Sequence, residues 1–436
     1  MYKPRLHVMV LTALAGALLT LPAAADSQAR IVRLSDVQGT VQIDKNSGLG
    51  FENAFANLPI TQGTELRTRE NGRAEIEFED GSTLRVTPNT SVEFSRLGLN
   101  DAGKRISVVD LVEGRAYLNW LGKSGDEFTL KFSREKVELG QAAHIRVACS
   151  SSMAAIASFK NDLEVVGPSG TVKLEKNKMV SFDGSDDDKA TVAKNFDEDP
   201  YDEWDRQSIE YHDQYSKNNS TSYGYGSSDL SYYGGYTTLA GYGTLWQPYF
   251  AGAGWNPFMD GAWSWYPGMG YMWASAYPWG WMPYYYGNWM FVPGYGWGWQ
   301  PGGGNTWHGG IHYVGAAVAG FQAPVAPKGT VNTVAVGRGG AVVVTNAPAM
   351  GWVVKNGSAG LGIPRGSLEN LRHLNTQVAK TGSVELHAAA PFAASSWRAS
   401  GYGYGGAHPV GFGEVGNASA RSSGHSSGGG GGHSGH

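Results

Sequence analysis

The fold is decided by residues 74–87, in which Ala74-Glu-Ile-Glu-Phe-Glu79 and Ser82-Thr-Leu-Arg-Val-Thr87 stand on either side of Asp80-Gly81. Apolar residues occupy alternate positions in both runs, and Glu, Arg or Thr stand between them. This period of two predicts strands with one apolar face, because a helix would repeat every 3.6 residues. Asp-Gly between two such runs is a strong hairpin signal. The segment therefore predicts an antiparallel pair of strands.

The same alternation extends from residue 30 to residue 182. Further strands are predicted every 8 to 12 residues, with apolar side chains on one face and polar side chains on the other. Turn residues separate these strands at Asn71-Gly72, Pro88-Asn89, Glu113-Gly114, Asn161-Asp162 and Pro168-Ser-Gly170. This spacing predicts an independent all-β domain, a sandwich, barrel or β-roll, for 30–182.

Residues 1–25 have the pattern of a secretory signal peptide. Basic residues precede a 14-residue apolar run, Val8–Leu21, and Ala23-Ala24-Ala25 offers a cleavage site before Asp26. The run is shorter than the roughly 20 residues that a spanning helix needs. We expect export to the periplasm or the cell surface and a mature chain without a transmembrane helix; an uncleaved N-terminal anchor is the alternative.

Composition limits the classes of function. The chain has 436 residues and a formal net charge of −4, which gives no reason to expect a nucleic-acid partner. Its single cysteine, Cys149, cannot form an internal disulfide and is expected to be a buried small side chain. We find no nucleophile elbow, zinc-protease motif or phosphate-binding loop, so we expect no enzyme, no cofactor and no metal site.

Residues 183–245 are predicted to be a linker, first acidic and then rich in Tyr, Gly and Ser. Ten acidic residues lie between Asp183 and Asp205, but they lack the spacing of an EF-hand, so a solvated segment is favoured over a calcium site. A short amphipathic helix can follow Pro200.

Residues 246–307 hold eleven of the fifteen tryptophans and repeat an aromatic-x-Pro unit. Such an array indicates a surface for packing or adhesion, and packing of the rings on one another and on glycine backbone is the favoured interpretation. Contact with a neutral cell-wall glycan, or with another partner, is the alternative. The candidate aromatic interaction surface consists of Trp246, Trp255, Trp265, Trp281, Trp289 and Trp299.

Residues 308–399 are expected to form a small strand and helix region, with strands at 330–336 and 341–345. A helix is predicted from Ser367 to Gly382, because Leu368, Leu371, Leu374 and Val378 fall on one face. His308 and His312 lie four residues apart, but Gly309-Gly310 between them disfavours the helix that would align them. Residues 400–436 are a Gly/Ser/His-rich tail that is expected to be disordered.

Several segments of the first domain resemble the FecR-type extracytoplasmic domain. They are Gly63-Thr-Glu-Leu-Arg-Thr68, Gly72-Arg-Ala-Glu-Ile-Glu-Phe78, Asp80-Gly-Ser-Thr-Leu-Arg-Val86, Pro88-Asn-Thr90 and Leu111-Val-Glu-Gly114. The resemblance implies an all-β module that binds protein partners. The aromatic residues 278–301 are similar to an uncharacterised Trp/Tyr-rich region found behind such domains in bacterial exported proteins, and this similarity implies no activity.

These features lead to one favoured function and two alternatives. We expect a non-enzymatic envelope protein whose FecR-type domain is a binding or scaffold module, with the aromatic block as its docking region. The first alternative is a structural surface or matrix protein whose aromatic block self-associates or binds glycan. The second is a FecR-like signalling component; only about seven residues precede the apolar run, so we expect it to lack the cytoplasmic anti-sigma part.

Residues 246–307 are predicted not to fold when expressed alone. The burial of their rings does not offset the backbone entropy of so glycine-rich a segment unless it docks on another part of the protein. The isolated fragment should therefore lack dispersed amide signals in NMR spectra. A cooperative melt of the monomeric fragment would contradict this prediction.

Overall fold

The computed structural model describes residues 30–123, 125–184, 189–218, 224–302, 307–337 and 352–386. The described part is mostly β, which confirms the predicted class. The segments 1–25, 341–345 and 400–436, for which the sequence predicts a signal peptide, a strand and a disordered tail, lie outside these ranges. Within the ranges, no helix has both the length and the apolar character needed to cross a membrane.

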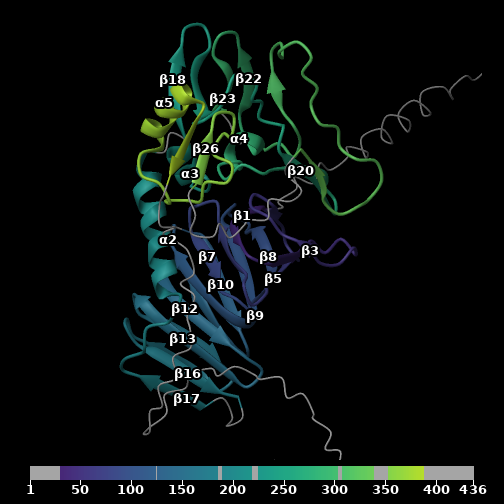
Figure 1. Cartoon of the computed structure of the whole chain (residues 1–436). Helices are drawn as coiled ribbons and strands as arrows, with labels where there is room; N and C mark the ends of the chain where they lie inside the picture. The colour runs from purple at the N-terminus through teal and green to yellow at the C-terminus, as the bar shows by residue number, and fades with distance from the viewer. Residues whose placement is uncertain are drawn as a thin grey trace, which may run out of the picture. The chain divides into compact units, whose positions relative to one another are not determined.

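Residues 30–193, here called the β-domain, form two sheets that share one long strand (Figure 1). The strands of sheet 1, in spatial order, are β4 (Pro59–Ile60), β1 (Val32–Gln38), β6 (Arg73–Glu77), β7 (Thr83–Val86), β9 (Arg105–Trp120), β12 (Ala143–Cys149), β13 (Met153–Lys160), β16 (Met179–Asp183) and β17 (Lys189–Ala193). Those of sheet 2 are β3 (Glu52–Asn53), β2 (Val41–Asp44), β5 (Glu65–Thr68), β8 (Ser91–Leu99), β9, β10 (Glu127–Phe132), β11 (Glu135–Leu139), β14 (Leu163–Gly167) and β15 (Gly170–Leu174).

The predicted hairpin is present, since β6 and β7 pair antiparallel around Asp80-Gly81. The Asp80 carboxylate accepts hydrogen bonds from the backbone N–H and the hydroxyl of Ser82, which is ordinary turn chemistry. The apolar positions of this hairpin, Ala74, Ile76, Leu84 and Val86, are at most 1% exposed and lie in one hydrophobic cluster with residues of sheet 2. The alternation therefore identified the inward face correctly.

The turn predicted at Glu113-Gly114 is wrong, because both residues lie inside the 16-residue strand β9. The first half of β9 pairs with β8 and β10 in sheet 2, and its second half pairs with β7 and β12 in sheet 1. Gly114 sits where the strand passes from one sheet to the other, with φ of +95°. A β-carbon there would lie 2.5 Å from the carbonyl oxygen of Asn89, so only glycine allows this passage.

The Gly114→Ala substitution is therefore expected to destabilise the protein by more than about 1 kcal/mol, since it adds a close backbone contact to an unfavourable φ. The measurement is the urea midpoint, followed by circular dichroism. Gly98→Ala is the matched control, because Gly98 lies in the neighbouring strand β8 and has no atom within 4 Å of the added carbon. Equal effects of the two substitutions would contradict the role assigned to Gly114.

The segment 183–245, predicted as a linker, carries regular structure. It contains the end of β16, β17, the helices α2 (Asp202–Tyr215), η1 (Ser216–Asn218) and α3 (Ser227–Tyr233), β18 (Gly234–Leu239) and the start of the next strand. The helix expected after Pro200 is confirmed as α2. Its acidic first turn complements the positive end of the helix dipole.

The described residues between 224 and 386, here called the aromatic region, include short strands and helices (Figure 1). After α3 and β18 come β19 (Gly243–Pro248), β20 (Gly261–Tyr266), β21 (Gly270–Ser275), α4 (Met282–Tyr285), β22 (Asn288–Val292), β23 (Gly296–Gln300), β24 (Tyr313–Val314), β25 (Val334–Val336), β26 (Trp352–Lys355), α5 (Leu371–Thr381) and β27 (Ser383–Leu386). The predicted C-terminal helix is confirmed as α5, and it ends before Gly382 as expected. It begins at Leu371 rather than Ser367, because the Asn370 side chain caps it by accepting a hydrogen bond from the His373 N–H.

Two hairpins of the aromatic region are built from the same sequence, Gly-Tyr-Gly-x-x-Trp-Gln-Pro, at 241–248 and 294–301. The first contributes β19 and the second β23, and these strands pair antiparallel with Trp246 directly opposite Trp299. Gln247 donates to the Tyr295 carbonyl, and Gln300 donates to the Tyr242 carbonyl, both at 3.4 Å. The two copies are thus related by a local two-fold axis, and the glutamine of each copy bonds to the turn of the other.

Candidate functional site: a buried ionic junction

The outer face of sheet 1 is covered, although its sequence carries charges. Glu75, Glu77 and Arg85 point away from the hydrophobic core, yet each is at most 2% exposed. Their partners come from α2, from the N-cap residue of α3 and from the segment before α5. Buried charges are costly unless they are paired and hydrogen-bonded. The contacts that satisfy them therefore define how the β-domain and the aromatic region join.

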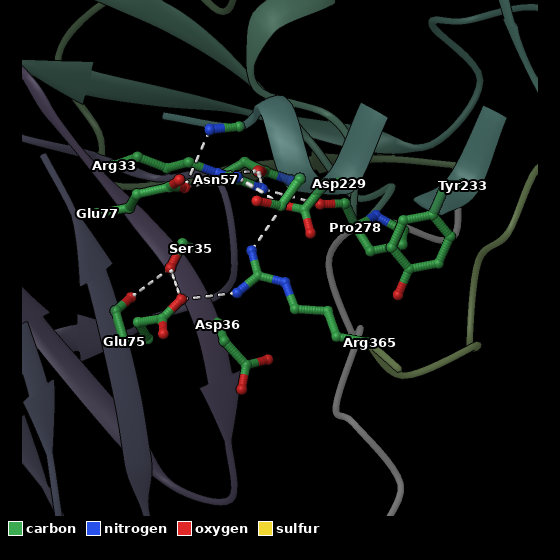
Figure 2. Close-up of polar contacts among 12 residues, drawn as sticks. Arg33, Ser35, Asp36, Asn57, Glu75, Glu77, Asp229, Tyr233, Pro278 and Arg365 are labelled. Carbon is green, nitrogen blue, oxygen red and sulfur yellow. Dashed lines mark hydrogen bonds and ion pairs between the residues drawn. The ribbon is translucent and has the colours of Figure 1, made fainter. Parts of the chain in front are cut away.

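Arg33 on β1 is fully buried and links four segments (Figure 2). Its guanidinium donates to the Asn57 side-chain oxygen at 2.8 and 3.1 Å and to the Pro278 carbonyl at 2.8 Å. It also pairs with Glu77 at 3.1 Å and with Asp229 of α3 at 2.6 Å. The planar, forked guanidinium suits such multiple contacts better than a lysine ammonium would.

Asn57 extends this contact on its other side. Its side-chain nitrogen donates to the carbonyl oxygens of Ser275 and Tyr277 at 3.1 and 2.7 Å. One amide thus accepts from Arg33 and donates to the aromatic region. The residue lies at φ of +68°, a conformation that asparagine tolerates better than most residues.

Glu75 is the second centre of the junction. Its carboxylate accepts from Arg85 at 2.8 Å, from Arg365 at 2.9 Å and from Ser35 at 2.7 Å. The His212 Nε2 of α2 lies 2.9 Å from the same carboxylate. Figure 2 shows Arg365 reaching between Glu75 and Asp229, and its contact with Asp229 is 2.6 Å. Arg365 therefore ties the segment before α5 to sheet 1 and to α3.

Carboxylates outnumber arginines in this junction, and His212 lies against two of them, Glu75 and Glu77. Its carboxylates are Glu75, Glu77, Asp205 and Asp229, and its arginines are Arg33, Arg85 and Arg365. Three guanidinium groups face four carboxylates, so a cationic His212 adds a positive charge where carboxylates are in excess.

The pKa values of the two glutamates of β6 shift in opposite directions. Burial tends to raise the pKa of both carboxyls. At Glu75 the charges of His212, Arg85 and Arg365 outweigh burial and hold the pKa well below its usual range. At Glu77 burial prevails over His212 and Arg33, and the nearby Asp229 adds to it, so the pKa is raised.

Three aspartates that follow β17 in the chain form ion pairs with arginines of sheet 1. Asp199 pairs with Arg115 at 2.6 Å, Asp202 pairs with Arg146 at 2.7 Å, and Asp205 pairs with Arg85 at 2.8 Å. These carboxylates belong to the run that the sequence predicts to be solvated. Residues 196–215, here called the strap, therefore lie on sheet 1 and are held there by ion pairs.

Two segments of the chain match known protein families. Residues 64–164 match the FecR protein family. They run from the turn before β5 to the start of β14, so the match lies inside the β-domain and confirms the resemblance. Residues 227–328 match a family of unknown function, DUF6600, which begins at α3 and contains the tryptophan block. The predicted order, a FecR domain followed by an uncharacterised region, is therefore correct.

Two crystal structures of a proposed anti-sigma factor from Parabacteroides distasonis ATCC 8503 are similar to part of the chain. Both are 17% identical in sequence with a TM-score of 0.28; they match 32% and 34% of this chain and 63% and 71% of their own. In the first comparison the chain thus spans less than two thirds of that protein. No curated protein matches the chain.

The six tryptophans of the predicted interaction surface lie mostly in the interior. Trp246, Trp255, Trp281, Trp289 and Trp299 are at most 5% exposed, and only Trp265 of the six is partly exposed. The five buried rings belong to one aromatic cluster, so their partners in this structure are other residues of the aromatic region. As a surface for an external partner, the set remains a prediction.

Trp279, which the sequence analysis did not single out, lies at the centre of this cluster. Its ring stacks on Tyr277 and Tyr284, with centroid distances of 5.0 and 5.9 Å. It also lies 4.9 Å from the Trp246 ring, and its N–H donates to the Ala359 carbonyl at 2.7 Å. Five of the six tryptophans in the predicted set begin an aromatic-x-Pro unit, whereas Trp279 is followed by Gly-Trp and carries no such local signal.

Two other predictions concern single residues. Cys149 is buried as expected, and burial raises the pKa of its thiol to about 11, so it is an inert side chain. The rings of His308 and His312 stack at a centroid distance of 4.4 Å without a helix between them. Among the described residues, no group of three or more metal-ligating side chains includes this pair.

The charged residues of the junction were also missed. A signal was present in the sequence, because Asp199, Asp202 and Asp205 repeat every three residues while Glu75 and Arg85 lie on the polar face of the predicted hairpin. Charge complementarity between the two segments could have suggested their pairing, but no local pattern indicates which strands they meet.

The junction is predicted to weaken as pH rises. Burial alone would lower the pKa of His212, but Glu75 and Glu77 outweigh it and raise that pKa. The stabilisation from the cationic ring is complete below the unfolded pKa of about 6.5 and is lost as pH rises through the higher folded value. Glu75 and Asp229 have lowered pKa values, so their stabilisation is present above the unfolded carboxyl pKa of about 4 and is lost in stronger acid.

The urea midpoint of the full protein should therefore fall between pH 6 and pH 9, and His212→Gln should remove most of that slope. A cavity of about 40 Å³ beside His212, lined also by Asp36, Ser208 and Arg365, has room for water that can exchange protons with the ring. His373→Gln, at an exposed histidine of α5, is the control and should leave the slope unchanged. An unchanged slope in His212→Gln would refute the assignment.

Proposed function

We propose that this protein is a non-enzymatic, exported component of the cell envelope whose FecR-type domain binds a protein partner. The match of residues 64–164 to the FecR family carries the proposal. The ionic junction supports it, because Arg33, Glu75 and Arg365 fix the aromatic region against one face of the domain. The aromatic region then acts as a scaffold for the FecR-type module. Partner binding is also the step that a FecR-like signalling component would require.

The matrix-protein alternative receives less support. It needs aromatic rings that reach glycan or a second copy, whereas five of the six candidate tryptophans are buried. Trp265, with its partial exposure, is the ring best placed for such a contact.

Site-specific photo-crosslinking in the producing cells tests the two functions against each other. A crosslinking residue replaces Val112 or Val192, which are 60% and 48% exposed in the β-domain, or Val353 of the aromatic region, which is 53% exposed. A discrete protein adduct from the β-domain positions, and none from Val353, is expected. Adducts from Val353 alone, or only between copies of the chain, would favour the matrix alternative and overturn the proposal. Fractionation and N-terminal sequencing in the same cells test export and the expected start at Asp26.

A further inference from the structure

The outer face of sheet 1 carries a row of three arginines, one histidine and one tyrosine. Arg85, Tyr117 and Arg146 stand directly opposite one another on β7, β9 and β12. Arg115 and His144 lie on the same face, two residues along β9 and β12 from members of the row, because side chains alternate along a strand. These five residues, 85, 115, 117, 144 and 146, are called the basic row. Like charges this close require anions to offset them.

The strap supplies those anions at a regular spacing. The Tyr117 hydroxyl lies 2.9 Å from the Asp199 carboxylate and 2.8 Å from that of Asp202, so the two carboxylates share its one proton, in addition to their ion pairs with Arg115 and Arg146. Asp202 accepts two hydrogen bonds from one guanidinium nitrogen of Arg146. Asp205, one turn further along, pairs with Arg85 and lies 2.6 Å from His144. The basic row thus binds an Asp-x-x-Asp-x-x-Asp sequence at the start of a helix.

Aromatic rings complete the recognition. The Arg146 guanidinium lies 5.2 Å from the Phe196 ring, and that of Arg73 lies 5.0 Å from the Trp204 ring. Such cation–π contacts favour an aromatic residue beside the acidic positions of whatever occupies the row.

The Asp199 and Asp202 end of the strap is held by contacts that water and salt can weaken. The side chains of the Arg115–Asp199 pair are 27% and 9% exposed and those of the Arg146–Asp202 pair 11% and 15%, whereas those of the Arg85–Asp205 pair are 1% and 3% exposed. Water and salt therefore weaken the first two pairs more than the third. The Asp199 and Asp202 end can therefore leave the row while Asp205 remains in the buried junction.

We propose that the basic row is a docking site for the acidic N-terminus of a helix from a partner protein, and that residues 196–202 of this chain occupy it in the partner's absence. The proposal rests on the proposed function, since it names the class of partner that the FecR-type domain binds. The occupant in this structure displays the required chemistry: aspartates three residues apart at a helix start, with an adjacent aromatic residue.

The test uses the full-length protein and a fluorescent peptide with the sequence of residues 194–216. In an Asp199→Asn/Asp202→Asn variant the row is vacated, and this variant is expected to bind the peptide at least tenfold more tightly than the wild type. Adding Arg146→Gln should abolish this gain, rising salt should weaken binding, and a peptide with asparagine at both positions should not bind. A variant with a wild-type melting temperature that binds neither peptide, or both equally, would overturn the proposal.

A second measurement uses the wild-type protein and therefore tests the proposal even where the Asp199→Asn/Asp202→Asn variant does not fold. In hydrogen–deuterium exchange of the wild type, excess peptide should accelerate exchange of the first-turn amides of α2, and no change there would overturn the proposal.

The docking proposal and the proposed function can fail separately. If the peptide does not bind but photo-crosslinking finds a protein partner, that partner binds on another face. If no protein is crosslinked, the proposed function is rejected, whatever the result with the peptide.

Discussion

Replacing Arg33 by Met should lower the free energy of unfolding by about 3–5 kcal/mol, because it removes a cation that two buried carboxylates share. Arg33 is fully buried and contacts Glu77 and Asp229, which are themselves at most 1% exposed. The substitution also removes the hydrogen bond to the Pro278 carbonyl, so the aromatic region loses a direct tie to β1. Urea unfolding followed by tryptophan fluorescence and by circular dichroism measures both consequences.

Lys136→Met is the matched control for this change. Lys136 pairs with Glu138, and their side chains are 44% and 64% exposed, so its loss should cost less than about 0.5 kcal/mol. Adding Glu77→Gln to Arg33→Met should cost less than the sum of the two single changes, because the residues are in contact. Strict additivity, or an Arg33→Met protein as stable as the control, would show that the junction does not depend on this charge.

Replacing Trp279 by Ala should be comparably destabilising, by about 3–5 kcal/mol, since it empties the centre of the aromatic cluster. The substitution removes stacking on Tyr277 and Tyr284 and leaves the Ala359 carbonyl without its donor. Trp279→Phe keeps a ring but loses the N–H, so its effect should be intermediate. Thermal unfolding followed by near-ultraviolet circular dichroism reports on the packing of these rings.

Trp265→Ala is the control within the same region, because Trp265 is the partly exposed member of the predicted set. Its loss should cost about 1 kcal/mol, less than that of the buried ring. Equal effects would indicate that the cluster is not the stabilising element of the aromatic region. Weaker association with the cell envelope in Trp265→Ala, at unchanged stability, would instead favour the glycan alternative.

Local patterns were sufficient for the strands and their inward faces. The alternation around Asp80-Gly81 gave a hairpin whose apolar side chains Ile76 and Leu84 are fully buried, since a period of two and a tight turn are properties of the segment itself. The same holds for α5, where the 3.6 period and Gly382 marked the helix and its end. The turn predicted at Glu113-Gly114 was wrong because Gly114 has a positive φ inside strand β9, where no strand ends.

The sequence by itself thus determined the all-β class, the FecR-type segment and the amphipathic elements. Tertiary structure alone decided which polar groups are buried and what the tryptophans contact. Arg33 meets Pro278 across 245 positions, and Glu75 meets Arg365 across 290. No periodicity spans such separations, and a charged side chain on a strand looks the same whether it faces water or a buried partner. The difference arises only when another part of the chain excludes the water, because desolvation then makes each charge depend on its partner.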